Sequence, residues 1–163
     1  MNKTSENQLR KVKASSSWLG KMKTRQYVRD FTFLVDEPEK LGGTNEGPTP
    51  LEYVIGAFNG CLLVVIEMVA KEQQFLFKDV VIESYGTVDR RGLLGIADVL
   101  PHFQKVVNNI TFVTEETNER LDNLQAEVQK RCPMYNLLVD AGIDVQLNWH
   151  ISDEEDVKER RNV

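Results

Sequence analysis

A long apolar segment, residues 50–71 (PLEYVIGAFNGCLLVVIEMVAK), dominates the sequence, and Asn59 and Glu67 are the only strongly polar side chains in its interior. As a helix it spans roughly 30 Å, the width of a small domain. Thr49 can act as N-cap, a proline follows it, and Glu52 completes a capping box. Because this helix is apolar on every side, we expect it to be buried on every side.

The composition is that of a globular domain, with 163 residues, 41% hydrophobic and 28% charged. A net charge of -5 argues against a nucleic-acid partner. No apolar core follows the basic N-terminus, so the pattern is not that of a signal peptide, and we expect a cytoplasmic protein. The apolar segment is about long enough to cross a bilayer. Its polar interruptions and the amphipathic strands around it favour a core helix, so we expect no membrane partner.

Residues 25–35 alternate with a period of two, as in a strand. The more aromatic face, which we expect to point inward, also carries Arg29. One interpretation is an edge-strand arginine that reaches water. The other is a buried guanidinium held by a carboxylate or a thiolate.

The remaining pattern predicts an α+β fold with mostly antiparallel sheet. Thr114 is expected to cap the second helix, and Asn108-Asn109 to form a bulge. Residues 1–163 are read as a single domain, with residues 1–15 and 152–163 as flexible tails. The expected elements are a loop over 36–49, strands over 78–88, 103–113 and 143–149, and helices over 115–131 and 134–141.

The second helix has a narrow apolar stripe, so one sheet and one such helix leave part of the long helix uncovered. A second subunit would supply the missing cover. We therefore predict a homodimer with residues 50–71 near its centre.

Two cysteines, Cys61 in the long helix and Cys132 before Pro133, are the candidates for chemistry. In a reducing compartment such a pair is more often catalytic or redox-active than a structural disulfide. As N-cap of a short helix, Cys132 should have a lowered pKa. Cys61 is either an inert small hydrophobe or a reactive thiol whose thiolate is stabilised by a cation, for which Arg29 is the best candidate.

Glu52 lies nine residues before Cys61, which places the two on opposite sides of their helix. Glu52 could therefore serve the cysteine of a partner subunit and orient Arg29 there, or act in the capping box alone. His102 and His150 are isolated, so no metal or cofactor is expected.

Three stretches, VRDFTFLVDEP, LGGTNEGPTPLEYVIGAFNGC and RCPMYNLL, resemble the osmotically inducible protein / organic hydroperoxide resistance (OsmC/Ohr) family. The resemblance implies an intertwined α+β homodimer, with long central helices wrapped by antiparallel sheets. It also implies a thiol peroxidase site at the dimer interface. In the characterised hydroperoxide reductases, Asn-Pro-Glu places the glutamate ten residues before the cysteine. Leu51 holds that place here and Glu52 is one step closer, as in a less characterised branch.

The resemblance implies that Cys61 is the peroxidatic cysteine, Cys132 the resolving cysteine and Glu52 the site carboxylate. Arg29, or alternatively Arg25, is the site arginine. The predicted function is a stress-response peroxidase that reduces organic hydroperoxides with a dithiol reductant, through a Cys61 sulfenate and a disulfide. The alternatives are a redox-stress sensor or binding protein without turnover, and a structural dimer with inert cysteines.

Overall fold

The computed structural model describes residues 9–160, which form two compact units, one ending at Tyr53 and the other beginning at Val54. The expectation of one domain over 1–163 stays a prediction.

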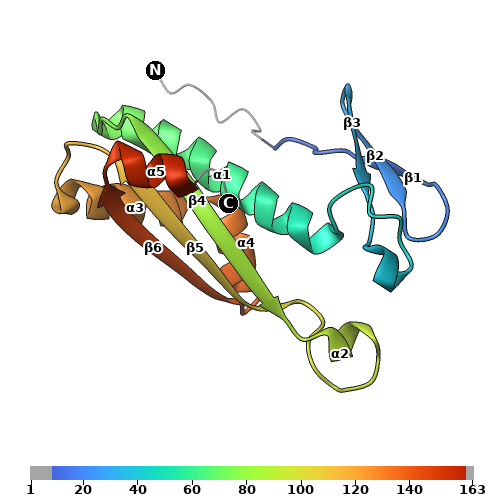
Figure 1. Ribbon diagram of the computed structural model, residues 1–163. Helices are drawn as coiled ribbons and strands as arrows, with labels where there is room; N and C mark the ends of the chain where they lie inside the picture. Colours follow the sequence, from blue (N-terminus) through green and yellow to red (C-terminus); the bar gives the residue numbers. More distant parts are fainter. Residues whose placement is uncertain (1–8, 161–163) are drawn as a thin grey trace. The chain divides into compact units, whose positions relative to one another are not determined.

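The first unit contains an antiparallel sheet of β1 (Ser15–Trp18), β2 (Thr24–Val28) and β3 (Phe31–Val35), in that order (Figure 1). The single strand expected over 25–35 is wrong, because Val28 pairs with Phe31 and Arg29-Asp30 form the turn of a hairpin. Arg29 has φ +54°, in the left-handed region that glycine or asparagine usually occupies in such turns. Neither residue stands at this turn, so nothing in the sequence signalled it. The Arg29 side chain is exposed and does not point inward.

The loop after β3, which includes the short 3-10 helix η1 (Glu39–Leu41), is built around the fully buried Asp36. Its carboxylate accepts hydrogen bonds from the Thr44 hydroxyl (2.6 Å) and the backbone N–H groups of Glu37 (2.8 Å) and Glu46 (3.1 Å). These donors, the Thr44 hydroxyl above all, lower the pKa of Asp36 to about 2. A Cβ on Gly43 would lie 1.8 Å from the Glu37 carbonyl oxygen, so only glycine fits there.

The long helix α1 (Pro50–Gln73) begins with the predicted capping box. The Glu52 carboxylate accepts from the Thr49 N–H at 2.7 Å, and the Thr49 hydroxyl accepts from the Glu52 N–H at 3.3 Å. The single chain covers only part of α1, as the narrow apolar stripe of the second helix led us to expect, and burial on every side stays a prediction for the homodimer. One face is buried, while Leu63, Val64 and Met68 on the other face are 36%, 60% and 49% exposed.

The second unit contains a sheet in the order β4 (Asp79–Val88), β5 (Phe103–Val113), β6 (Asp144–Ser152). β4 and β5 are antiparallel, whereas β5 and β6 are parallel and joined by a helical crossover. The bulge expected at Asn108-Asn109 is wrong, because the register shift lies at Thr87/Val88.

The crossover consists of α3 (Asn118–Arg131) and α4 (Pro133–Asp140). Thr117, rather than Thr114, is the N-cap of α3, since its hydroxyl accepts from the Arg120 N–H and the Thr114 hydroxyl donates to the Leu76 carbonyl. The core of the unit lies between the sheet, α1 and these two helices. Its fully buried members include Phe58, Leu62, Ile66, Val106, Ile110, Phe112, Leu124 and Val128.

The tail expected over 152–163 is helical in part, because α5 (Glu154–Arg160) follows β6. Val157 is fully buried, and Arg160 forms an ion pair with Glu83 of β4 at 2.6 Å. Residues 1–8 and 161–163 of the expected tails lie outside the described residues. The short helix α2 (Arg90–Leu93) lies in the loop between β4 and β5, where Leu93, Leu94, Ile96 and Leu100 are exposed.

Candidate functional site

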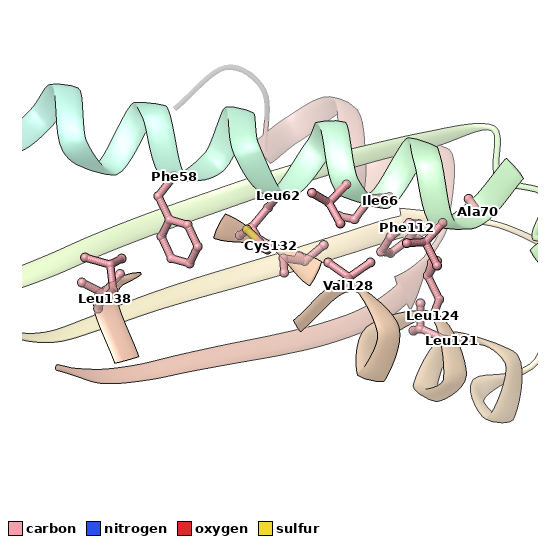
Figure 2. Close-up of a cluster of buried hydrophobic side chains, with 14 of the residues drawn as sticks. Phe58, Leu62, Ile66, Ala70, Phe112, Leu121, Leu124, Val128, Cys132 and Leu138 are labelled. Carbon is pink, nitrogen blue, oxygen red and sulfur yellow. The ribbon is translucent and has the colours of Figure 1, made fainter. Parts of the chain in front are cut away.

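The structure brings the two cysteines together. The Sγ atoms of Cys61 and Cys132 lie 3.6 Å apart, although the residues are 71 positions apart in sequence. Both thiols are free. Cys61 comes from the middle of α1 and Cys132 from the junction of α3 and α4, and in Figure 2 the sulfur of Cys132 lies beneath Leu62.

The α3–α4 junction is fixed by local chemistry. Pro133 cannot continue α3 but suits the first position of α4, so the chain bends at Cys132. The Asn136 side-chain amide donates to the carbonyls of Gln129 (3.0 Å) and Cys132 (2.8 Å), which ties the end of one helix to the start of the next. The Cys132 sulfur therefore has a defined position against α1.

The environment of Cys132 keeps its thiol protonated. The side chain is fully buried, and this burial raises its pKa to about 11. The N–H groups of Tyr135 and Met134 oppose the rise but do not overcome it, and the sulfur does not make a regular capping hydrogen bond. The expectation of a lowered pKa for Cys132 is wrong, because desolvation outweighs the field of a short helix.

Cys61 is half-buried and packs against the core at the edge of the buried face of α1. By helical periodicity its neighbours on the open side are Ala57, Val64 and Met68, all exposed and apolar. In the single chain this thiol therefore opens onto an apolar surface, whereas Cys132 is reached through Cys61 or the core.

The predicted charged partners belong to the first unit. The Arg29 guanidinium lies 5.0 Å from the Phe31 ring centre, in a cation–π contact at the hairpin. Arg25, the alternative, is exposed in β2. Glu52 is engaged in the capping box. Because these side chains and the thiols lie in different units, their action on Cys61 stays a prediction.

Sequence reasoning missed a polar cluster under α1. The Asn59 side-chain oxygen accepts from the Ser84 hydroxyl at 2.7 Å and from the Asn108 amide at 2.8 Å, and the Asn108 amide also donates to Ser84 at 2.6 Å. The Asn108 side-chain oxygen is buried and has no hydrogen-bond partner among residues 9–160. The signal that could have found this cluster was the amide of Asn59 inside an apolar helix.

Among residues 9–160, no group of three or more His, Cys, Asp or Glu side chains could hold a metal ion. By length and composition alone, α1 could cross a membrane, and a core helix of a globular protein passes the same criterion.

The fold and the thiol pair define a class: an α+β protein in which a long helix and a helical crossover bring two free cysteines into contact. The sequence pattern of the OsmC-like proteins matches residues 43–148. This chain belongs to that family. Among curated proteins no sequence matches it.

Solved structures share the fold. An OsmC-like protein from Mycoplasma pneumoniae is 14% identical with a TM-score of 0.76, over 87% of this chain and 97% of that one. An organic hydroperoxide resistance protein OsmC from Legionella pneumophila, described as a predicted redox protein, is 20% identical with a TM-score of 0.65, over 88% and 98%. OhrB, an organic hydroperoxide resistance protein of Bacillus subtilis, is 20% identical with a TM-score of 0.61, over 85% and 97%. The α+β fold expected from the sequence is thus confirmed.

Proposed function

We propose that this protein is a stress-response thiol peroxidase that reduces organic hydroperoxides. The observation that supports the proposal most is the 3.6 Å separation of the Cys61 and Cys132 sulfur atoms in the reduced chain. Peroxide reduction by a two-cysteine mechanism needs the second thiol within reach of the first.

In the proposed reaction the Cys61 thiolate attacks the terminal oxygen of ROOH. The O–O bond breaks, the alkoxide leaves as ROH after taking up a proton, and Cys61 becomes a sulfenic acid. The Cys132 sulfur then attacks the Cys61 sulfur, forming a disulfide and releasing water. A dithiol reductant opens the disulfide by exchange and restores both thiols.

The order of the two cysteines follows from their surroundings. The attacking thiol must meet the peroxide, and Cys61 is half-buried whereas Cys132 has no exposed surface. A peroxidatic cysteine also reacts as a thiolate, and the raised pKa of Cys132 disfavours that form. The apolar residues beside Cys61 would line the site at the proposed dimer interface and favour an organic over a small polar hydroperoxide.

We further propose a homodimer in the cytoplasm, formed on the exposed face of α1. Leu63, Val64 and Met68 lie open there, and beyond its own helical turn a Cβ at Gly56 or Gly60 would meet no atom of residues 9–160 within 4 Å. Small residues beside exposed apolar ones suit close approach of a second helix. In this dimer Arg29, or Arg25, stabilises the Cys61 thiolate, and a partner glutamate equivalent to Glu52 orients that arginine.

The test measures the reduction of cumene hydroperoxide, linoleic acid hydroperoxide and hydrogen peroxide by the wild type, Cys61→Ser and Cys132→Ser. We expect the wild type to consume many equivalents per chain with dithiothreitol or dihydrolipoamide. Cys61→Ser should be inactive, and Cys132→Ser should accumulate a trappable sulfenic acid on Cys61. If neither thiol is lost on treating the reduced wild type with any of these peroxides, the proposed function is wrong.

The burial of Cys132 favours a second candidate, a redox sensor. Because the Cys132 sulfur is fully buried, a reductant can attack the Cys61–Cys132 disulfide only at the Cys61 sulfur. Such a protein would form the disulfide with one equivalent of peroxide and then stop. Catalytic cycling with excess dithiol separates the two candidates.

A further inference from the structure

We infer that Cys132 has a role before resolution: its thiol donates a hydrogen bond to the Cys61 sulfur and stabilises the Cys61 thiolate. The same proton later leaves with the sulfenic oxygen as water. The first step needs no peroxide, and only the second rests on the proposed function.

The geometry supports one direction for this contact. The Sγ atoms are 3.6 Å apart, with Cys132 placed as donor and Cys61 as acceptor. The N–H groups of Met134 and Tyr135 act on the Cys132 sulfur from the start of α4, on its acceptor side. A thiol has one weak donor and a weak acceptor sulfur, so these N–H groups leave the S–H free to point at α1.

The protonation of the pair is asymmetric in the required sense. Burial raises the pKa of Cys132 to about 11, so its proton stays on the sulfur throughout the neutral range. A hydrogen bond donated to a sulfur atom stabilises the thiolate form of that sulfur more than its neutral thiol form. Cys132 is therefore suited to support negative charge on Cys61 and not to carry it.

Nearby charged groups on the same unit are engaged with one another or exposed. Arg131, next to Cys132, pairs with Glu72 of α1 and lies 3.9 Å from Glu127. Glu67 of α1 is exposed, and Tyr135 of α4 packs at the edge of the core. The core faces of β4, β5 and β6, all within the described residues, carry no ionisable side chain. Among the described residues of this unit, Cys132 is the titratable group that contacts Cys61.

The contact also sets the course of the second step. When Cys61 is oxidised to Cys61–S–OH, the Cys132 S–H is already beside it. The S–S bond forms as the S–O bond breaks, and the Cys132 proton combines with the departing hydroxide. The electron pair of the new S–S bond comes from the Cys132 sulfur, the electron pair of the S–O bond leaves with the hydroxide, and water is the only product released.

The experiment measures the alkylation rate of Cys61 by iodoacetamide between pH 5 and 10, read by peptide mass, with no peroxide present. The full-length wild type is compared with Cys132→Ala, which lacks the donor, and Cys132→Ser, which keeps one. We expect the pH midpoint of alkylation in Cys132→Ala to rise by about one unit, the scale of one hydrogen bond to a charged group. Cys132→Ser should keep the wild-type midpoint.

The inference is overturned if the pH midpoint of Cys61 alkylation in Cys132→Ala is equal to or below that of the wild type. It is also overturned if Cys132→Ser has the same raised midpoint as Cys132→Ala, because the effect would then come from altered solvation. If Cys132→Ala fails to fold, the infrared S–H stretch of the wild type decides. It should shift to lower frequency as pH rises through the Cys61 midpoint and stay constant in Cys61→Ala, and an unshifted band refutes the contact. Peroxide turnover can fail without changing either readout.

Discussion

Oxidation of the thiol pair should stabilise the protein strongly, because the disulfide would close a large loop. Cys61 and Cys132 are 71 positions apart. Cross-linking a loop of that size removes roughly 15 cal/mol/K of entropy from the unfolded chain, or about 4 kcal/mol at 25 °C. The sulfur atoms must approach from 3.6 Å to bonding distance, and the resulting strain in α1 and the crossover lowers this gain.

We therefore expect the oxidised protein to be more stable by about 2 to 4 kcal/mol, with a Tm roughly 5 to 15 °C higher. The assay is differential scanning calorimetry of the reduced protein and of protein oxidised with one equivalent of cumene hydroperoxide, with the disulfide verified by mass. Cys132→Ser treated in the same way is the control and should not gain stability. A verified Cys61–Cys132 disulfide with an unchanged or lowered Tm would refute the reasoning, because native-state strain would then equal or exceed the loop term.

Further predictions concern the Asp36 loop and the open face of α1. Asp36→Asn should lower the Tm by roughly 5 °C at pH 7. The pKa of Asp36 is lowered from 3.8 to about 2, so its contribution is complete above about pH 4 and fades as pH falls through 2. The acid-unfolding curves of wild type and variant should therefore converge near pH 2, and a constant difference would contradict this assignment. Gly43→Ala should unfold the loop because its Cβ meets a carbonyl oxygen, whereas a Cβ at Gly60 meets no atom of the described residues beyond its own helical turn. Since alanine favours a helix over glycine by about 0.5–1 kcal/mol, Gly60→Ala should stabilise a monomer. Gly60→Leu should dissociate the proposed dimer in light scattering, and an undisturbed dimer would place the interface elsewhere.

The elements best predicted from sequence were those with strong local signals. The capping box at Thr49 and Glu52, the strand over residues 103–113 and the break at Pro133 are each encoded within a few residues, and the structure confirms them. The meeting of Cys61 and Cys132 was expected only through the family resemblance. It depends on a crossover between parallel strands, which no local pattern specifies.

The failures have physical causes. The hairpin at Arg29 was missed because two short strands and their turn preserve the alternation of a single strand. The pKa of Cys132 was misjudged because burial, which depends on the whole core, outweighed the local helix end. The open face of α1 was expected, but the partner that covers it stays a prediction, because apolarity alone does not tell an intramolecular contact from an intermolecular one.

The crossover that carries Cys132 has a consequence for biosynthesis. On the ribosome, Cys61 emerges long before its partner thiol, and the crossover of α3 and α4 lacks its C-terminal anchor until β6 has paired with the free edge of β5. Vectorial synthesis therefore completes the dithiol only when residue 152 has left the exit tunnel. Until then Cys61 is an isolated nascent-chain thiol, and an oxidant would push it toward sulfinic acid with no neighbour to intercept it.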